Sequence, residues 1–443
     1  MMKSVGILSI TCALVFGLLP IQAWAQDNNS EHPARAEQNF GGDWLTRSKM
    51  SGDWGGYRTK LVDNGVKLDV DLMQVVQGVN EGGLDPGYKY GGSADYWLHL
   101  DTDKMGLWPG GFVTIFAESQ FGENVLNKTG VFTAVNSDAL FPKPDEQLTN
   151  LTSVVFMQFL SEQFGIVLGK LQTLDGDLNA FASGRGNTQF FNQNFVFNPV
   201  TIRTIPYSTL GGGIIILPTK NLEEMLFTFT ALDPSGVPDQ AGFDDAFEDG
   251  VALASEFRFA IKPFGLPGHQ SIGGTWSSKN YAVLDQEPRL LLLQFLRSQI
   301  TGMGGVKLDR EDDSWSVYYN FDQFFYTEAS DETQGLGLFG RFGQADDRTN
   351  PIERFYSIGL GGKGLIPTRD QDTFGIGFYY IEVSDKIPSL NLNLLDDGKG
   401  GEFFYNIELT PWFHLTPNFQ IIEPGRTGVD TVYLTGLRAF VDF

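Results

Sequence analysis

Extended stretches of this chain alternate apolar and polar residues with a period of two. From Val66 to Leu72 the even positions are apolar and the odd positions are charged, and the pattern recurs in Val251–Ile261 and Trp315–Asp322. Successive side chains of a β-strand point to opposite faces, so this period predicts strands with one apolar and one polar face. In a soluble sandwich the apolar faces would pack together. In a transmembrane barrel they would contact lipid, and the polar faces would line the lumen.

Three further features favour the transmembrane barrel. Residues 1–25 carry Lys3, an apolar run over Val5–Leu19 and the sequence Ala23-Trp24-Ala25, which together predict a removable export signal. Beyond residue 25, no apolar run approaches the roughly 18–20 residues of a membrane-spanning helix. The chain nevertheless contains 37 Phe, 14 Tyr, 8 Trp and 53 Gly, which is unusual for a soluble acidic domain. We therefore expect an all-β, antiparallel transmembrane barrel.

Turn signals divide the chain into seventeen candidate strands, whereas bacterial single-chain barrels have an even number. External loops are long and periplasmic turns are short, so every second connection should be an external loop. When the external loops are assigned from the N-terminus and, separately, from the C-terminus, the two assignments disagree between residues 278 and 335. Assigning Gly302–Asp309 to an external loop restores sixteen strands, and assigning Gly335–Phe342 to one would do the same. We expect the first, because Thr327–Gln334 forms a compact turn between two well-patterned strands. The candidates start near residues 66, 94, 111, 153, 164, 209, 224, 250, 269, 302, 314, 335, 353, 372, 402, 415 and 431, with external loops at 80–93, 121–152, 172–208, 233–249, after 278, and at 343–352, 383–401 and 423–430.

The expected organisation is a signal peptide at 1–25, a periplasmic or plug-like segment at 26–65, and a barrel at 66–443. Within the second part, Arg58–Asn64 is expected to form one or two helical turns that end at Gly65. The last strand alternates up to Phe443, and an aromatic residue in phase at this position resembles the signal that outer-membrane assembly machinery reads. The expected location is the outer membrane of a Gram-negative bacterium, in contact with its lipids and lipopolysaccharide.

Several classes of function are disfavoured. Lys and Arg number 31 against 54 Asp and Glu, and the net charge of −23 argues against a nucleic-acid partner. The single cysteine, Cys12, lies in the export signal, so the mature chain has no disulfide or thiolate metal site. His32, His99, His269 and His414 do not have metal-ligand spacing, and nucleophile-elbow, phosphate-loop and zinc-protease motifs are absent. We expect no enzymatic activity, no cofactor and no metal.

Four segments stand out in order along the chain: Ser51–Arg58 with Leu61 and Gly65, Gly106–Gly111, Gly359–Leu365 running to Asp372–Tyr380, and Glu402–Pro424. Together they resemble the carbohydrate-selective porin family typified by glucose porins. No single segment is specific, but their common order makes the resemblance strong. It implies a sixteen-stranded outer-membrane barrel through which sugars diffuse passively, and it does not identify the residues that contact sugar.

A sugar pathway needs charged groups that hydrogen-bond hydroxyls and aromatic rings that contact the apolar face of the sugar. For any one residue, a solvated wall position that only balances charge is the simpler interpretation. As a set, the inward-phase residues predict a wet lumen of mixed charge. From strand phase, the candidates are Asp69, Asp71, Trp97, His99, Asp101, Glu118, Glu256, Arg258, Glu408 and Arg438.

The segment Gln172–Pro206 is expected to narrow the pore. It is far longer than a hairpin requires, and irregular loops longer than about 12–15 residues are usually functional or disordered. Besides several asparagines, it carries groups suited to sugar contact. The alternative is an external loop that packs its rings on neighbouring loops. The candidate contacts are Arg185, Arg203, Phe190, Phe191, Phe195 and Phe197.

Three functions remain open at this point. The first, which we prefer, is a porin for glucose-like monosaccharides. The second is a non-specific or cation-favouring porin, suggested by the acidic composition, and the third is a structural or adhesive barrel with a closed lumen. The sequence identifies neither the particular sugar nor whether the chains associate into homo-oligomers.

Overall fold

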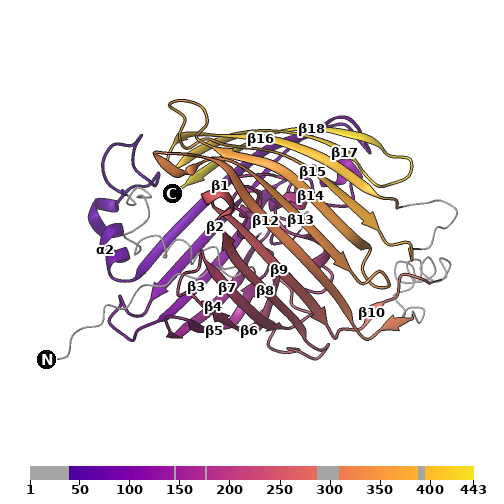
Figure 1. Cartoon of the computed structure of the whole chain (residues 1–443), viewed down its shortest axis with the longest axis horizontal. Helices are drawn as coiled ribbons and strands as arrows, with labels where there is room; N and C mark the ends of the chain where they lie inside the picture. The colour runs from indigo at the N-terminus through magenta and orange to yellow at the C-terminus, as the bar shows by residue number, and fades with distance from the viewer. Residues whose placement is uncertain (1–38, 144–145, 175–176, 287–308, 388–394) are drawn as a thin grey trace.

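In a computed structural model, sixteen strands close into one antiparallel barrel (Figure 1). The structure describes residues 39–143, 146–174, 177–286, 309–387 and 395–443. The predicted fold class and strand number are confirmed. The barrel strands are β1 Val66–Gly83, β2 Gly87–Asp101, β3 Gly111–Gly122, β4 Thr149–Ser161, β5 Phe164–Gln172, β6 Ser208–Ile216, β7 Met225–Leu232, β8 Ala252–Ile261, β9 Gly268–Ser277, β12 Ser314–Glu328, β13 Asp331–Ala345, β14 Ile352–Lys363, β15 Thr373–Val383, β16 Gly398–Thr410, β17 Phe413–Glu423 and β18 Asp430–Asp442.

Each barrel strand pairs with its neighbours along the chain, and β1 pairs with β18 to close the sheet. The candidate strand Gly335–Phe342 lies within β13, so its assignment to the barrel is confirmed. The other candidate, 302–309, lies outside the described residues except for Asp309. Two short strands between β9 and β12, β10 (Tyr281–Ala282) and β11 (Arg310–Glu311), form a separate pair.

Exposure alternates along the strands in the inverted sense expected of a membrane barrel. In β17, Phe419 and Ile421 are 40% and 42% exposed on the outer face, whereas Gln420 between them is fully buried inside. In β1, Leu68 and Val76 face outward, and Asp69 and Gln77 are buried within the barrel. Among the described residues, no helix is long and apolar enough to cross a membrane.

The connections between strands differ at the two ends of the barrel. At the short-turn end they include 162–163, 329–330 and 411–412, and at the long-loop end they include 123–148, 173–207 and 233–251. This alternation matches the predicted loop series with one correction. The external loop expected at 80–93 is only 84–86, because β1 and β2 stay paired up to Val79 and Gly87. Beyond the last paired residue of β1, the side chain of Asn80 donates a hydrogen bond to the hydroxyl of Tyr88 in β2 at 2.9 Å, which also keeps the two strands together.

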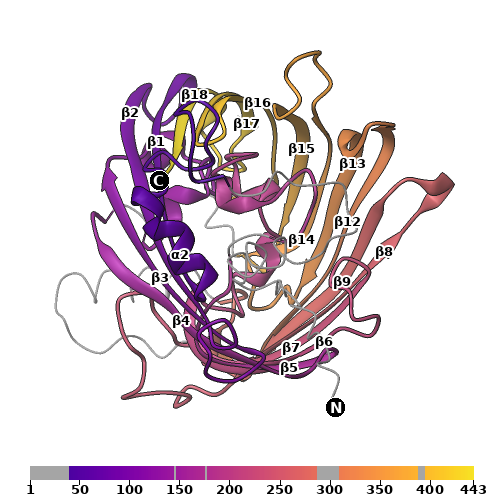
Figure 2. The same ribbon diagram turned by 90° about the vertical axis from the view of Figure 1, so that its left-hand side faces the viewer.

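The segment 39–65 packs at the short-turn end, where β1 meets β18 (Figures 1 and 2). Its helix α2 (Tyr57–Asp63) follows a short turn η1 (Trp54–Gly56) and matches the predicted helix. The guanidinium of Arg58, which is buried, donates to the carbonyl oxygens of Leu68 at 3.0 Å and of Phe443 at 2.7 Å. The amide of Met50 also donates to the carbonyl of Asp442 at 2.8 Å. The segment therefore bridges the two strands that close the barrel.

Replacing Arg58 with alanine is expected to weaken this closure. The change removes a buried side chain and its hydrogen bonds to the two backbone oxygens, at a cost of about 1–3 kcal/mol in the free energy of unfolding. Thermal unfolding in detergent, followed by the mobility of folded and unfolded bands on gels, measures the effect. Lys60→Ala, an exposed change on the same helix, is the control, and equal unfolding temperatures for the two variants would contradict the bridging role of Arg58.

Candidate functional site

The described residues of the connection 173–207, which are 173–174 and 177–207, lie inside the barrel (Figure 2). Its side chains donate to carbonyls of the wall, from Asn179 to Phe321 of β12 at 2.9 Å and from Asn198 to Phe342 of β13 at 3.0 Å. On other sides of the barrel, Asn192 donates to Gln420 of β17 at 3.1 Å and Thr204 shares a hydrogen bond with Thr275 of β9 at 2.6 Å. Contacts on separated strands hold the segment across the lumen, so it occupies the interior rather than the outer surface.

Arg185 anchors this inner segment to β2 and β3. Its guanidinium lies 3.1 Å from the carboxylate of Asp95, bonds to Glu118, and lies 4.0 Å from Asp138. The hydroxyl of Tyr207 donates to the other oxygen of Glu118 at 2.6 Å. Charge-assisted hydrogen bonds of this kind are among the stronger polar contacts in proteins. The structure thus brings Arg185 and Glu118, both predicted, together with Asp95, which the prediction did not include.

A second ion pair fixes the opposite part of the segment. Asp177 receives two hydrogen bonds from the guanidinium of Arg341 in β13, at 2.7 and 2.6 Å, and one from the amide of Asn320 in β12 at 2.9 Å. Neither Asp177 nor Arg341 was among the predicted site residues. The alternation of side chains along β13 could have identified Arg341 as a residue that faces the lumen. Asp177 lies in an irregular loop, where no such alternation exists.

A third anchor joins the segment to β16 and β18. The backbone amides of Phe191 and Asn192 donate to the carboxylate of Glu402 at 2.6 and 2.9 Å. Arg438, fully buried as an inward residue of β18, donates to the carbonyl of Gln189 at 3.0 Å, and its guanidinium lies 4.3 Å from the ring centre of Phe191. Glu402 is a further functional candidate that strand phase could have identified, since it shares the inward face of β16 with Glu408.

The four predicted aromatic contacts of this segment require a correction. Phe190, Phe191 and Phe195 are fully buried and Phe197 is 5% exposed, so their rings do not face a solute in the lumen. Phe190 packs against Phe404 with ring centres 4.7 Å apart. Gly377 of β15 leaves room for Phe195, because a Cβ there would lie 2.6 Å from that ring. The rings of Phe190 and Phe195 therefore attach the segment to the wall, whereas Phe197 packs with Phe141 of the connection 123–148, as the alternative of packing on a neighbouring loop expects.

The remaining predicted residues fall into two groups. Asp69, Asp71, Trp97, His99, Asp101, Glu256, Arg258 and Glu408 lie on inward phases of their strands, and most are buried. Asp69 pairs with Lys49 at 2.8 Å at the short-turn end. Arg203 is exposed, and it donates to the carbonyl of Thr349 at 3.0 Å and lies over the ring of Tyr281. Arg203 thus contacts the long-loop end and is separate from the other charged groups.

Asp138, in the connection 123–148, adds a titratable group beside Arg185. Burial raises the pKa of Asp138 to about 6, although Arg185 and a hydrogen bond from Ser93 act to lower it and Glu118 acts to raise it. At pH values between about 4, the ordinary pKa of an aspartate, and about 6, Asp138 is protonated more often in the folded chain than in the unfolded chain. This group therefore lowers the free energy of unfolding as the pH rises through about 6.

The Asp138→Asn variant is expected to lose this component of the pH dependence. Its unfolding temperature in detergent, measured from pH 4 to 7 and compared with the wild type, should show an advantage that grows with pH. Asp244→Asn, a change in an exposed loop, is the control. An advantage that stays constant over this range would contradict the ionisation of Asp138 near pH 6.

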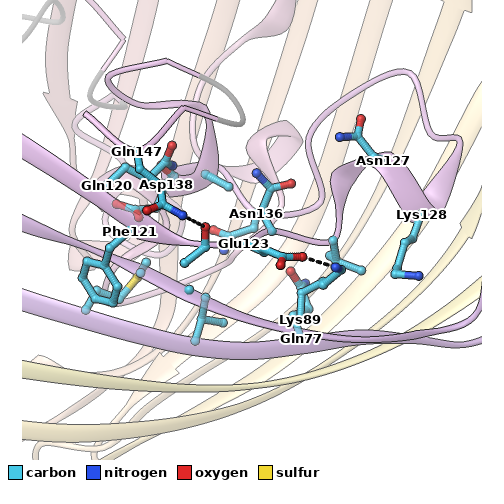
Figure 3. A pocket seen from close by; sticks show the side chains of 18 of the residues that line it. Gln77, Lys89, Gln120, Phe121, Glu123, Asn127, Lys128, Asn136, Asp138 and Gln147 are labelled. Carbon is cyan, nitrogen blue, oxygen red and sulfur yellow. Dashed lines mark hydrogen bonds and ion pairs between the residues drawn. The ribbon is translucent and has the colours of Figure 1, made fainter. Parts of the chain in front are cut away.

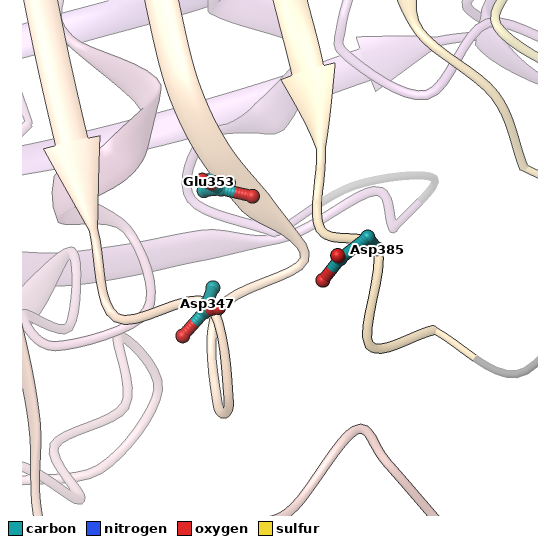
Figure 4. A group of neighbouring side chains, drawn as sticks. All are labelled: Asp347, Glu353 and Asp385. Carbon is teal, nitrogen blue, oxygen red and sulfur yellow. The ribbon is translucent and has the colours of Figure 1, made fainter.

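Three carboxylates, of Asp347, Glu353 and Asp385, meet at the long-loop end (Figure 4). One oxygen of each lies within 4.8 Å of the others. Lys386 lies 3.0 Å from Asp385 and 3.8 Å from Asp347, and Arg354 lies 2.7 Å from Glu353. These two cations offset part of the charge of the three carboxylates, and no bound ion or other observation indicates a ligand, so the cluster gives no ground for assigning a metal site.

The barrel and its inner segment match a known family. A family model described as "Carbohydrate-selective porin, OprB family" matches residues 85–443. The chain belongs to this family. Membership makes it a carbohydrate-selective porin that passes its solutes by diffusion, and it confirms the resemblance inferred from four sequence segments. The family is one of channels and not of enzymes.

Individual relatives are more distant. Porin B of Pseudomonas aeruginosa is 23% identical over 435 residues, which cover 88% of this chain and 90% of that protein. Porin AaxA of Chlamydia pneumoniae is 30% identical over 209 residues, 45% of this chain and 41% of that protein. A solved high-pH structure of Pseudomonas putida OprB superimposes with a TM-score of 0.76 at 21% identity, over 91% of this chain and all of that one. This last likeness shows the shared fold.

Proposed function

We propose that this porin conducts glucose-like monosaccharides across the outer membrane of a Gram-negative bacterium, and that the segment 173–207 narrows its pathway. The observation that carries the proposal is the position of this segment, which is held inside the barrel by Arg185, Asp177 and Glu402. A barrel of sixteen strands otherwise encloses an aqueous channel. Selectivity then depends on the diameter and the lining groups at the narrowest point.

The charged groups around the inner segment suit a neutral polyhydroxy solute. Carboxylates accept and guanidiniums donate hydrogen bonds, so the two together match hydroxyls, which do both. Arg341 pairs with Asp177, and Arg185 lies among Asp95, Glu118 and Asp138, so groups of both signs lie together around the inner segment. Binding must also be weak enough for the solute to leave.

We also propose how the barrel is oriented in the outer membrane and what it contacts there. The long-loop end would face the outside and the short-turn end the periplasm, as in other barrels of this type. The apolar outer face would contact lipid and lipopolysaccharide, the signal peptide 1–25 would be removed on export, and the terminal Phe443 would be read by the barrel-assembly machinery.

Liposome swelling tests the proposed solute class. Vesicles that contain the purified protein should swell faster in isotonic glucose than in an isotonic neutral amino acid of similar size. Equal rates would indicate a non-specific porin, and swelling no faster than that of protein-free vesicles would indicate a structural or adhesive barrel. Either of these results would contradict the proposal.

A further inference from the structure

A cavity of about 460 Å³ lies between the wall strands β1–β3 and the connection 123–148 (Figure 3). Asp85 and Lys128 line it near the long-loop end, and Met73 and Asp138 line it deeper in the barrel. Ligand sites for small molecules usually occupy about 300–1,000 Å³. The cavity is therefore large enough for a small organic solute as well as for water.

Six amide side chains and six charged side chains make up the polar lining of this cavity. An amide both donates and accepts hydrogen bonds, as a hydroxyl group does, so a surface of amides matches a polyhydroxy ligand. Phe121, Met73 and Val75 add apolar surface that can contact the carbon-bound hydrogens of such a ligand. The lining amides are Gln77, Gln120, Asn124, Asn127, Asn136 and Gln147.

Both lysines of the lining are paired with carboxylates of the lining. Lys89 pairs with Glu123, and Lys128 pairs with Asp85. Farther along the lining, Glu146 lies 4.0 Å from Lys143, and Asp138 lies 4.0 Å from Arg185. Because both lysines of the lining are paired with carboxylates, the cavity favours a neutral ligand over an anion.

One lining amide has unused hydrogen-bonding capacity. Asn136 is only 3% exposed, and in the described part of the chain its Oδ1 atom has no hydrogen-bond partner. Its neighbour Gln77, equally buried, donates a single long hydrogen bond of 3.4 Å to the carbonyl of Val135. Buried polar atoms are usually satisfied, so an acceptor left open at a cavity wall indicates a ligand or water that completes it.

We propose that this cavity is an entry site in which a neutral mono- or disaccharide binds on the long-loop side of Arg185 before it passes the inner segment. The inference rests on the proposed function and adds a second binding position to it. The deep wall of the cavity includes Asp138, which accepts a hydrogen bond from Ser93 at 3.0 Å beside the Arg185 cluster. A sugar that leaves the cavity inward therefore meets the constriction next.

The test compares sugar block of the open channel from each side in planar bilayers, with glucose as the probe. Asn136→Leu removes the open acceptor and should weaken glucose binding in the cavity by about two- to tenfold, the effect of one lost hydrogen bond. Because glucose then occupies the entry site less often, the rate at which glucose added on the long-loop side blocks the channel should fall by the same factor. Asn280→Leu makes the same chemical change at an exposed position outside the cavity and should leave the rate unchanged. Gln120→Ala serves as a second cavity variant if the first fails to fold.

The possible results distinguish a failure of the entry site from a failure of the proposed function. If glucose blocks the wild type and the cavity variants behave like Asn280→Leu, the entry site is refuted and the proposed function stands. If glucose does not block the wild type from either side, the proposed function fails and the entry site fails with it. A rate that falls only in the cavity variants, and only from the long-loop side, supports the entry site.

Discussion

Deletion of Phe190–Phe197 is expected to raise the single-channel conductance several-fold and to abolish block by glucose. This part of the inner segment carries the rings that pack against Phe404 and Phe339, and the two backbone amides that bind Glu402. Without these attachments the segment loses its hold on β13 and β16, and the width of the pathway approaches that of an unobstructed sixteen-stranded barrel. Conductance in planar bilayers, with and without glucose, measures both effects.

A deletion of equal length at 241–248 provides the control. That stretch belongs to the connection between β7 and β8, and most of its residues are exposed. It should leave conductance and sugar block as in the wild type. If the two deletions have the same conductance, the inner segment does not set the width of the pathway.

Arg341→Ala is expected to have the largest effect on stability. The guanidinium of Arg341 is fully buried, and its removal leaves the carboxylate of Asp177 inside the barrel without its charged partner. Breaking a buried ion pair in this way costs about 3–5 kcal/mol in the free energy of unfolding. The same change should also loosen the inner segment near its start, which would appear as added current noise in single-channel records.

Thermal or denaturant unfolding in detergent measures the stability effect. Arg426→Ala removes an exposed arginine of the β17–β18 connection and should change the free energy of unfolding by less than about 0.5 kcal/mol. Asp177→Asn with Arg341→Met, which removes both charges, should recover part of the loss. Equal stability of Arg341→Ala and Arg426→Ala would contradict the anchoring role of the pair.

The fold was largely predictable because its main signals are local. A period of two in short stretches such as Val66–Leu72 indicated which side chains face lipid and which face the lumen. The lengths of the loops indicated at which end of the barrel each connection lies. The assignment of Gly335–Phe342 to the barrel depended on a neighbouring compact turn and is confirmed by β13. The length of Gln172–Pro206 indicated a loop that does more than join two strands, and the proposal that it narrows the pore stays a prediction.

Contacts between distant segments were not predictable in the same way. Strand phase places Glu118 inside the barrel, but it does not show that Arg185 is its partner. The burial of Phe190 and Phe195 depends on space left by glycines in β15, which are far away in the sequence. Asp177 lies in an irregular loop, so no periodicity marked it. The sequence therefore indicated which residues face the lumen, whereas their pairing required the three-dimensional structure.

Conductance of the wild-type channel during titration with glucose tests the central claim most directly. A carbohydrate-selective pathway narrowed by the inner segment predicts that the ion current falls saturably as glucose is added, because the bound sugar occupies the passage that ions use. A neutral amino acid of similar size should reduce the current only through its effect on the bulk solution. Equal, non-saturating reductions by both solutes would contradict sugar selectivity.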